Sequence, residues 1–133
     1  MMPELLGGDI ILTVAKVPLI GDVHAALCVG GGWVVNAIPP LVEAVRLVDL
    51  NGRWYFSRLR GIGAIYRIDA SEEERAAVAE YACRQVGKPY FLWSKRSDTT
   101  WYCTKLVWRS WLEGGGLDLA PDARIVFSRD LVE

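Results

Sequence analysis

Four residues in this sequence have side chains that could together carry out acyl transfer: Cys103, His24, Asn36 and Tyr90. A cysteine thiolate attacks an amide or ester carbonyl, and a histidine can take up the thiol proton. An asparagine oxygen can accept from the imidazole N–H and so fix the tautomer of the ring. A tyrosine hydroxyl can donate to the negative oxygen of the intermediate. These residue types are the ones that cysteine-dependent acyl transfer needs, provided that the fold brings them together.

Cys103 falls where a helix is expected to begin. Residues 101–112 contain neither Gly nor Pro, and Thr99 or Thr100 could act as the N-cap. In the first turn of a helix, free backbone N–H groups and the helix dipole favour a thiolate, so we expect the pKa of Cys103 to be lowered. The alternative is that Cys103 is one more buried apolar residue on a tryptophan-rich helix.

His24 and Asn36 lie in two strand-like runs, residues 24–29 and 33–38, on either side of three glycines. These runs predict a β-hairpin. A three-residue loop would place His24 and Asn36 on the same face of the hairpin, whereas a two-residue loop would place them on opposite faces. Asn36 would orient the imidazole of His24. Glu43 and Asp22 are the other candidates for that role.

Cys28 is a rival nucleophile because it shares a strand face with His24. Residues four apart on a strand are separated by roughly 13 Å, which is too far for direct proton transfer. Cys103 is therefore the expected nucleophile. Tyr90 could instead be a packing residue with no role in the chemistry.

Two spaced motifs resemble those of NlpC-type papain-like cysteine peptidases and amidases. Residues 87–90 (GKPY) match the G-x-P-Y loop, and residues 102–107 (YCTKLV) match the C-S-x-L-V helix start. His24 precedes Cys103, an order typical of the circularly permuted branch, which includes the YiiX-like proteins and the lecithin retinol acyltransferase group. Residues 8–12 (GDIIL), 24–30 (HAALCVG) and 33–37 (WVVNA) are similar to the strands of that branch. The resemblance covers about residues 7 to 111.

The resemblance implies an α+β fold, permuted papain-like, with an antiparallel sheet of about five strands packed by helices. It implies that Cys103 is the nucleophile, that His24 is the base, that Tyr90 lies in the active site and that no cofactor is needed. YiiX-like proteins often have glutamate where Asn36 stands. The expected activity is hydrolysis of an amide or ester in a small-molecule, peptide or lipid-amide substrate. A thiol acyltransferase and a catalytically inactive binding module on the same fold are the alternatives.

The remaining patterns agree with an α+β domain. Strands are expected at residues 9–14, 45–49 and 62–68. A helix is expected after Ser71, which forms a capping box with Glu74. At 133 residues the chain is expected to be one domain, 1–133.

The composition of the chain limits the classes of partner that it is expected to bind. Lys plus Arg number 15 and Asp plus Glu number 16, so the net charge of −1 gives no basic footprint for nucleic acid. No apolar run is long enough for a transmembrane span, and no signal peptide is recognised. The three cysteines are expected to be free thiols in the cytoplasm. With a single histidine and no C-x-x-C pair, we expect no metal site. The oligomeric state stays open.

Overall fold

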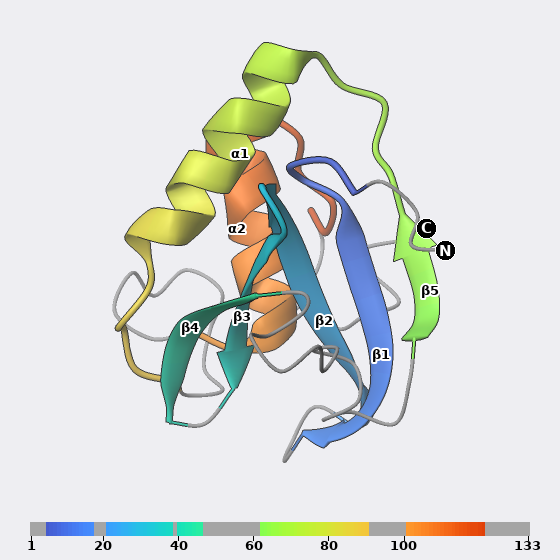
Figure 1. Cartoon of the computed structure of the whole chain (residues 1–133), viewed down its shortest axis with the longest axis vertical. Helices are drawn as coiled ribbons and strands as arrows, with labels where there is room; N and C mark the ends of the chain where they lie inside the picture. Colours follow the sequence, from blue (N-terminus) through green and yellow to red (C-terminus); the bar gives the residue numbers. More distant parts are fainter. Residues whose placement is uncertain (1–4, 18–20, 39, 47–61, 91–100, 122–133) are drawn as a thin grey trace.

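The computed structural model describes residues 5–17, 21–38, 40–46, 62–90 and 101–121, without the side chains of residues 13–17, 21–24, 38 and 62–64. Five strands form one antiparallel sheet in the order β4-β3-β2-β1-β5. Their bounds are β1 Ile10–Val17, β2 Gly21–Gly30, β3 Trp33–Ile38, β4 Leu41–Arg46 and β5 Ile62–Tyr66. Two helices follow, α1 Glu72–Arg84 and α2 Cys103–Gly115 (Figure 1). The predicted α+β class with a five-stranded antiparallel sheet is confirmed.

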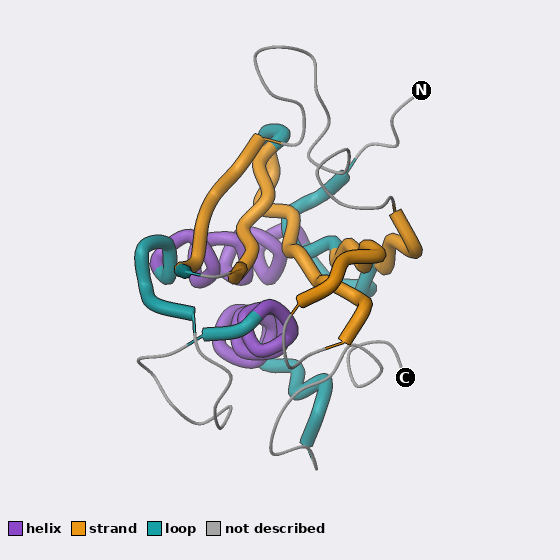
Figure 2. The backbone as a smooth tube through the Cα atoms, turned by 90° about the horizontal axis from the view of Figure 1, so that it is seen from below, coloured by secondary structure: helices purple, strands orange, loops and turns teal. Residues whose placement is uncertain are grey.

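The main core lies between the sheet and the helices. Alternate residues of the strands, such as Ala25, Leu27 and Val35, pack with Leu106 and Trp111 of α2. The intervening strand residues form a second cluster, which consists of Ile11, Ala26, Cys28 and Val34 with Leu5 and Val45. In Figure 2, α2 is seen almost along its axis, and α1 crosses it. Both faces of the central strands are thus buried, as the strands' apolar composition requires.

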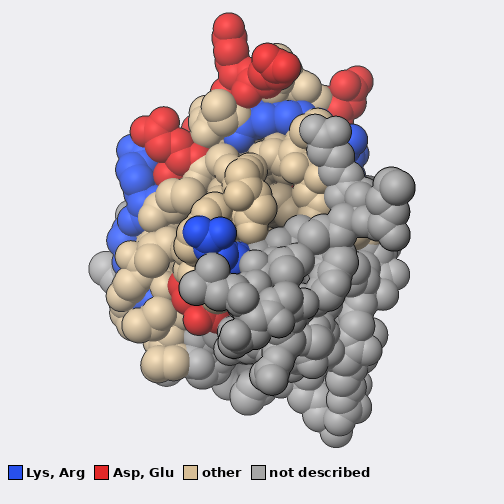
Figure 3. Space-filling view, viewed as in Figure 1, with Lys and Arg blue, Asp and Glu red and all other residues tan. Residues whose placement is uncertain are grey.

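Helix α1 begins as its sequence predicts. The Ser71 hydroxyl accepts from the Glu74 N–H at 3.1 Å, and the Glu74 carboxylate accepts from the Ser71 N–H at 3.0 Å. This reciprocal capping box satisfies two backbone donors that would otherwise lack partners. Figure 3 shows acidic side chains gathered over the same end of α1, where their charge suits the positive end of the helix dipole.

The start of α2 differs from the prediction. Tyr102 is the N-cap, with extended φ of −134° and no side-chain hydrogen bond to the cap, so a threonine N-cap at 99 or 100 is wrong. The chain is extended at Trp101 and Tyr102 because Trp101 pairs with Tyr90 and the Trp101 N–H donates to the Pro89 carbonyl at 3.1 Å. Cys103 is consequently the first residue of α2, which confirms its predicted place in the first turn.

The β2–β3 hairpin has a two-residue turn, and a register irregularity between Cys28 and Gly30 adds the extra residue. The bulge restores the register expected for a three-residue loop, in which Leu27 lies opposite Val35. Pairing between β2 and β3 ends there, although both strands continue. The two strands therefore part towards the end of the sheet where α2 begins (Figure 1).

The ends of several strands differ from their predicted positions. Strand β1 runs to Val17, and its partner β2 already begins at Gly21. Strand β4 occupies Leu41–Arg46, where Leu41 pairs with Ile38, so it begins earlier than the strand predicted at 45–49. Residues 47–49 lie outside the described part of the chain.

A close approach between Gly8 and Trp111 ties the start of β1 to α2. A Cβ atom on Gly8 would lie 2.7 Å from the indole ring, and the backbone of Gly8 has φ of +92°. The Trp111 Nε1–H donates to the Gly8 carbonyl at 3.0 Å. Only glycine meets both the steric and the conformational requirement at this position.

Candidate active site

The sulfur of Cys103 lies at the junction of α2 and β2. Cys103 is fully buried, and its Sγ accepts hydrogen bonds from the backbone N–H groups of Ala25, Thr104 and Cys103 itself. The last two are free first-turn donors of α2. Ala25 immediately follows His24 in β2. The fold thus brings Cys103 into contact with the peptide group that joins His24 to Ala25.

The Ala25 N–H is available to sulfur because of the sheet geometry. The Cys28 N–H donates to the Asp9 carbonyl at 2.9 Å, so even-numbered residues of this part of β2 point their backbone groups towards β1. Ala25 and Leu27 therefore point theirs towards β3. Since the β2–β3 pairing ends at Leu27, Ala25 has no strand partner on that side, and the sulfur of Cys103 takes that place.

Burial dominates the ionisation of Cys103. Desolvation raises the pKa of its thiol to about 11, even though the three N–H groups each favour the thiolate. The expectation of a lowered pKa is therefore wrong for this state of the protein. It considered the helix terminus, which acts as expected, but not the cost of charging a group removed from water.

His24 lies in β2, where its Cα is paired with that of Thr13 in β1. Its side chain lies outside the described part of the structure, as does that of Asp22, so a shared face of His24 and Asn36 stays a prediction. Asn36 is fully buried in β3. Its Cα partner in β4 is Glu43, which is half-buried, so the amide and the carboxylate stand on the same face of the sheet.

Tyr90 reaches the site from the loop that follows α1. Its backbone is fixed by the Tyr90 N–H, which donates to the Pro40 carbonyl at 2.9 Å, and by the bridge to Trp101. The hydroxyl is buried and has no hydrogen-bond partner among the described residues. Burial raises the pKa of Tyr90 well above its usual range, and the nearby charge of Cys103 raises it further. An unused donor thus lies close enough to Cys103 for a charge on the sulfur to affect its pKa.

Trp101 links the loop that contains Lys88 and Tyr90 to helix α2. Its buried indole has the ammonium groups of Lys105 and Lys88 at 4.7 and 5.6 Å from the ring centre and contacts Tyr81 edge-on, with ring centres 6.3 Å apart. The Lys88 Nζ also donates to Gln85 at 2.6 Å. Cation–π contacts of this kind stabilise the segment that leads into Cys103.

The other two cysteines lie away from this junction. Cys28 is buried in the second cluster, where burial and then the charge of Asp9 raise the pKa of its thiol to about 12. Cys83 is exposed on α1, and partial burial still raises its pKa. All three are free thiols. Among the described residues, no backbone hydrogen bond lowers the pKa of Cys28 or Cys83, in contrast to Cys103.

Sequence reasoning missed Ala25 and gave no role to Asp9. An alanine offers no chemical signal, since only its backbone N–H is used. Asp9 is fully buried and accepts from Arg67 at 2.8 Å and from the Leu6 N–H at 2.9 Å, with Arg75 at 3.5 Å. The pattern Gly-Asp before an apolar strand was the one available sign of this buried carboxylate.

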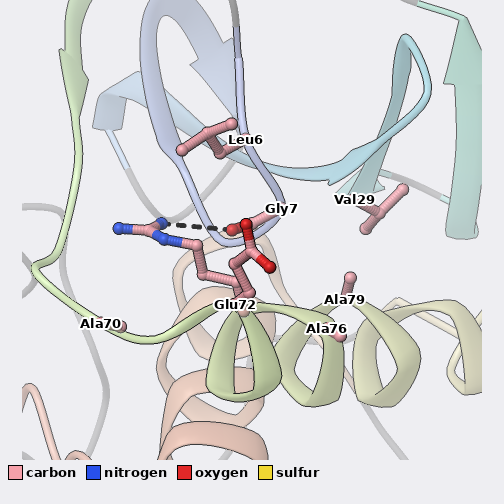
Figure 4. Close-up of a pocket in the computed structure, with 8 residues that line it drawn as sticks. Leu6, Gly7, Val29, Ala70, Glu72, Ala76 and Ala79 are labelled. Atoms are coloured by element: carbon pink, nitrogen blue, oxygen red, sulfur yellow. Dashed lines mark hydrogen bonds between the residues drawn. The ribbon is translucent and has the colours of Figure 1, made fainter.

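A pocket of about 470 Å³ lies away from Cys103, against the start of α1 (Figure 4). One of its lining residues, Gly7, precedes Gly8, which contacts Trp111. Trp111 is eight positions along α2 from Cys103, roughly 12 Å. The Arg75 side chain at its wall donates to the Gly7 carbonyl at 3.2 Å. Its lining residues are Leu6, Gly7, Val29, Ala70, Glu72, Arg75, Ala76 and Ala79.

Neither helix in the described ranges has the length and apolar composition that crossing a membrane requires.

Comparisons with known proteins agree with the sequence motifs. The family model described as "permuted papain-like amidase enzyme, YaeF/YiiX, C92 family" matches residues 7–123. The crystal structure of YiiX from Escherichia coli O157:H7, described as a metalloprotein, superposes with a TM-score of 0.67. The two chains are 22% identical, over 96% of this chain and 77% of YiiX. No curated protein matches this chain significantly.

Proposed function

Because the chain belongs to the permuted papain-like amidase family, we propose that it is a cysteine hydrolase acting on amide or ester bonds, with Cys103 as nucleophile and His24 as base. The observation that supports this most directly is the hydrogen bond from the Ala25 N–H to the Cys103 sulfur. That amide belongs to the peptide bond between His24 and Ala25. A sulfur at a helix start and a histidine-bearing strand are therefore neighbours, as the proposed chemistry requires.

The raised pKa of Cys103 favours one form of the mechanism. With a pKa of about 11 the thiol is protonated at neutral pH, so the proton must leave as the substrate is attacked. His24 takes this proton, the sulfur bonds to the carbonyl carbon, and His24 then protonates the leaving amine or alcohol. Water attacks the resulting thioester with His24 again as base, which releases the acid and restores the thiol.

Tyr90 is proposed as a donor to the negative oxygen of the tetrahedral intermediates. In the resting protein the Cys103 and Thr104 N–H groups already bond to sulfur, whereas the Tyr90 hydroxyl is buried without a partner in the described structure. A buried donor that forms its bond only as charge develops stabilises the transition state more than the substrate. The Cys103 N–H joins it when the sulfur moves towards the substrate.

Asn36 is proposed to orient His24 by accepting from its ring N–H, as asparagine does in papain-like sites. Its complete burial suits this role, because a hydrogen bond to imidazole is stronger away from water. Glu43 stands opposite Asn36 in β4 and could assist from the same face. Asn36 carries no charge, so it stabilises an imidazolium less than a carboxylate would.

The proposed substrates are peptides, lipid amides and other small acyl compounds. The proposed site of action is the cytoplasm, because the three cysteines are free thiols and thiols stay reduced there. The related YiiX is described as a metalloprotein. The described residues of this chain contain no group of three or more His, Cys, Asp or Glu that could hold a metal ion.

The test uses a p-nitrophenyl ester and intact-protein mass spectrometry. Wild type is expected to give a burst of nitrophenol and one acyl group on Cys103. Cys103→Ala should abolish the adduct, and His24→Ala should slow its formation at least 100-fold at neutral pH, since general base catalysis contributes about 10²–10⁴-fold. Cys83→Ala is the matched control, because it removes an exposed thiol and should leave the burst unchanged.

The same experiment separates the alternatives. Release of the acyl group to water identifies a hydrolase, and its release mainly to an added amine identifies a transferase. If wild type and Cys103→Ala acylate equally, the site is not catalytic, and the chain is a binding module on this fold.

A further inference from the structure

The sulfur of Cys103 receives a donor from outside its own helix. Two of its three N–H partners, Cys103 and Thr104, are first-turn groups that are close to any residue starting a helix. The third, Ala25, comes from the middle of the sheet. Ala25 and Cys103 are both fully buried, and a hydrogen bond is stronger in such surroundings than in water. A donor supplied by a second element needs a structural cause.

That cause is the parting of β2 and β3. The ladder alternates, so the Ala26 N–H points to β1, where Ile11 is its register partner, and the Ala25 N–H points to the β3 side. Had β3 stayed paired, a carbonyl would occupy that side. The pairing of β2 with β3 ends at Leu27 and Val35, before it reaches Ala25. The start of α2 lies on the side of Ala25 where β3 would otherwise pair.

We propose that the backbone N–H of Ala25 is a catalytic group of this site, which holds the Cys103 sulfur and stabilises the thiolate as its proton passes to His24. This inference rests on the proposed function of Cys103. No covalent bond to Ala25 forms or breaks: the proton moves from Sγ to the imidazole, and the amide donates throughout. Strand β2 would then supply both the base and a donor to the nucleophile.

The effect of the Ala25 N–H on the pKa of Cys103 can be estimated from the charge that the sulfur gains on ionisation. A hydrogen bond to a charged group is stronger than one to a neutral group by enough to change a pKa by about one unit. Burial outweighs the three donors here, so loss of one donor should move the thiol pKa upward from about 11. The neighbouring Tyr90 hydroxyl titrates higher still, because burial raises its pKa, and it stays neutral over the range in question.

The direct test replaces one amide by an ester. Ala25→lactic acid, introduced by nonsense suppression into the full chain, removes the N–H and keeps the methyl side chain. The rate of alkylation of Cys103 by iodoacetamide is followed across pH, with the modified residue identified by peptide mass spectrometry. We expect the midpoint to rise by about one pH unit and alkylation at a fixed lower pH to slow about tenfold.

Ala26→lactic acid is the matched control. It removes the same group one residue further along β2, where the N–H faces β1. It should cost sheet stability but leave the Cys103 midpoint unchanged. Equal midpoints for wild type and Ala25→lactic acid, or equal shifts for both esters, would overturn the proposal.

A second measurement needs no altered backbone and covers the case in which the ester variant does not fold. In protein labelled with ¹⁵N-alanine, the Ala25 amide resonance should move with the titration of Cys103, the Ala26 resonance should not, and Cys103→Ser should abolish the movement. A flat Ala25 resonance in wild type contradicts the proposal.

These results are distinguishable from failure of the proposed function. A shifted thiol midpoint in a protein that never acylates supports the hydrogen bond and refutes the hydrolase. Burst acylation that is equally fast in wild type and Ala25→lactic acid supports the hydrolase and refutes the role of Ala25.

Discussion

At the scale of single residues, the site combines a thiol that is hard to ionise with donors that ease its ionisation. Burial raises the pKa of Cys103 to about 11, whereas three backbone N–H groups act in the opposite direction. The balance keeps the thiol of Cys103 protonated at neutral pH, so the proposed reaction needs a base. It also protects Cys103 from oxidation, since the thiolate is the reactive form.

Tyr90→Phe tests the oxyanion role. Losing one such donor lowers kcat about 10²- to 10³-fold. Because the hydroxyl is buried without a partner in the described structure, its removal should leave the free energy of unfolding unchanged or raise it slightly. Acylation by a p-nitrophenyl ester and urea unfolding measure the two effects. Unchanged acylation would assign Tyr90 to packing, and so would loss of both activity and stability.

At the scale of elements, α2 is fixed at both ends. Its start follows the Trp101–Pro89 hydrogen bond, and its last turn crosses α1 at Gly114. A Cβ atom on Gly114 would lie 2.5 Å from the Val78 backbone N, so the two helices approach closely enough that only glycine fits. This crossing sets the direction of the helix that carries Cys103.

Gly114→Ala should therefore destabilise the protein by about 1–3 kcal/mol, the usual cost of overpacking a rigid contact. The contact is with backbone, which cannot turn aside. Gly116→Asn is the control: Gly116 has open space around it and φ of +66°, which asparagine tolerates. Urea unfolding monitored by tryptophan fluorescence compares the two. Equal stability of both variants would show that the helices can separate without cost.

At the scale of the whole molecule, the buried carboxylate of Asp9 joins segments far apart in the sequence. Arg67 follows β5, Arg75 lies in α1, and Asp9 itself leads into β1. One carboxylate thus holds both the edge strand and the first helix to the centre of the sheet. These ion pairs of Asp9 thus fix the part of the fold in which β2 and α2 meet.

Asp9→Asn should cost about 1–3 kcal/mol, because it keeps the shape of the side chain but leaves the largely buried Arg75 without its anion, whereas Arg67, whose side chain is 48% exposed, stays solvated. Glu113→Gln breaks the pair with Arg109 at 3.0 Å, in which the Glu113 side chain is 43% exposed, and should cost less than about 0.5 kcal/mol. Midpoints of urea unfolding compare them. A loss below 1 kcal/mol for Asp9→Asn would mean that the charges are replaceable.

The sequence alone determined those features that depend on neighbouring residues. The capping box of Ser71 and Glu74, a helix with Cys103 in its first turn and the β2–β3 hairpin follow from local backbone requirements, which residue types signal directly. The residue at which that helix begins does not, because pairing of Trp101 with Tyr90 sets it. The motifs around Tyr90 and Cys103 likewise indicated the family. Strand ends were less predictable, because pairing partners set them: β4 begins at Leu41 only because β3 ends at Ile38.

The tertiary structure alone decided how Cys103, the proposed nucleophile, is held. The pKa of Cys103 depends on how completely distant segments exclude water, and the Ala25 donor depends on where two strands part. Neither is encoded by a residue type, since every residue except proline carries a backbone N–H and burial is a property of the packed chain. The sequence thus identified Cys103, and packing determines the free energy of ionising its thiol.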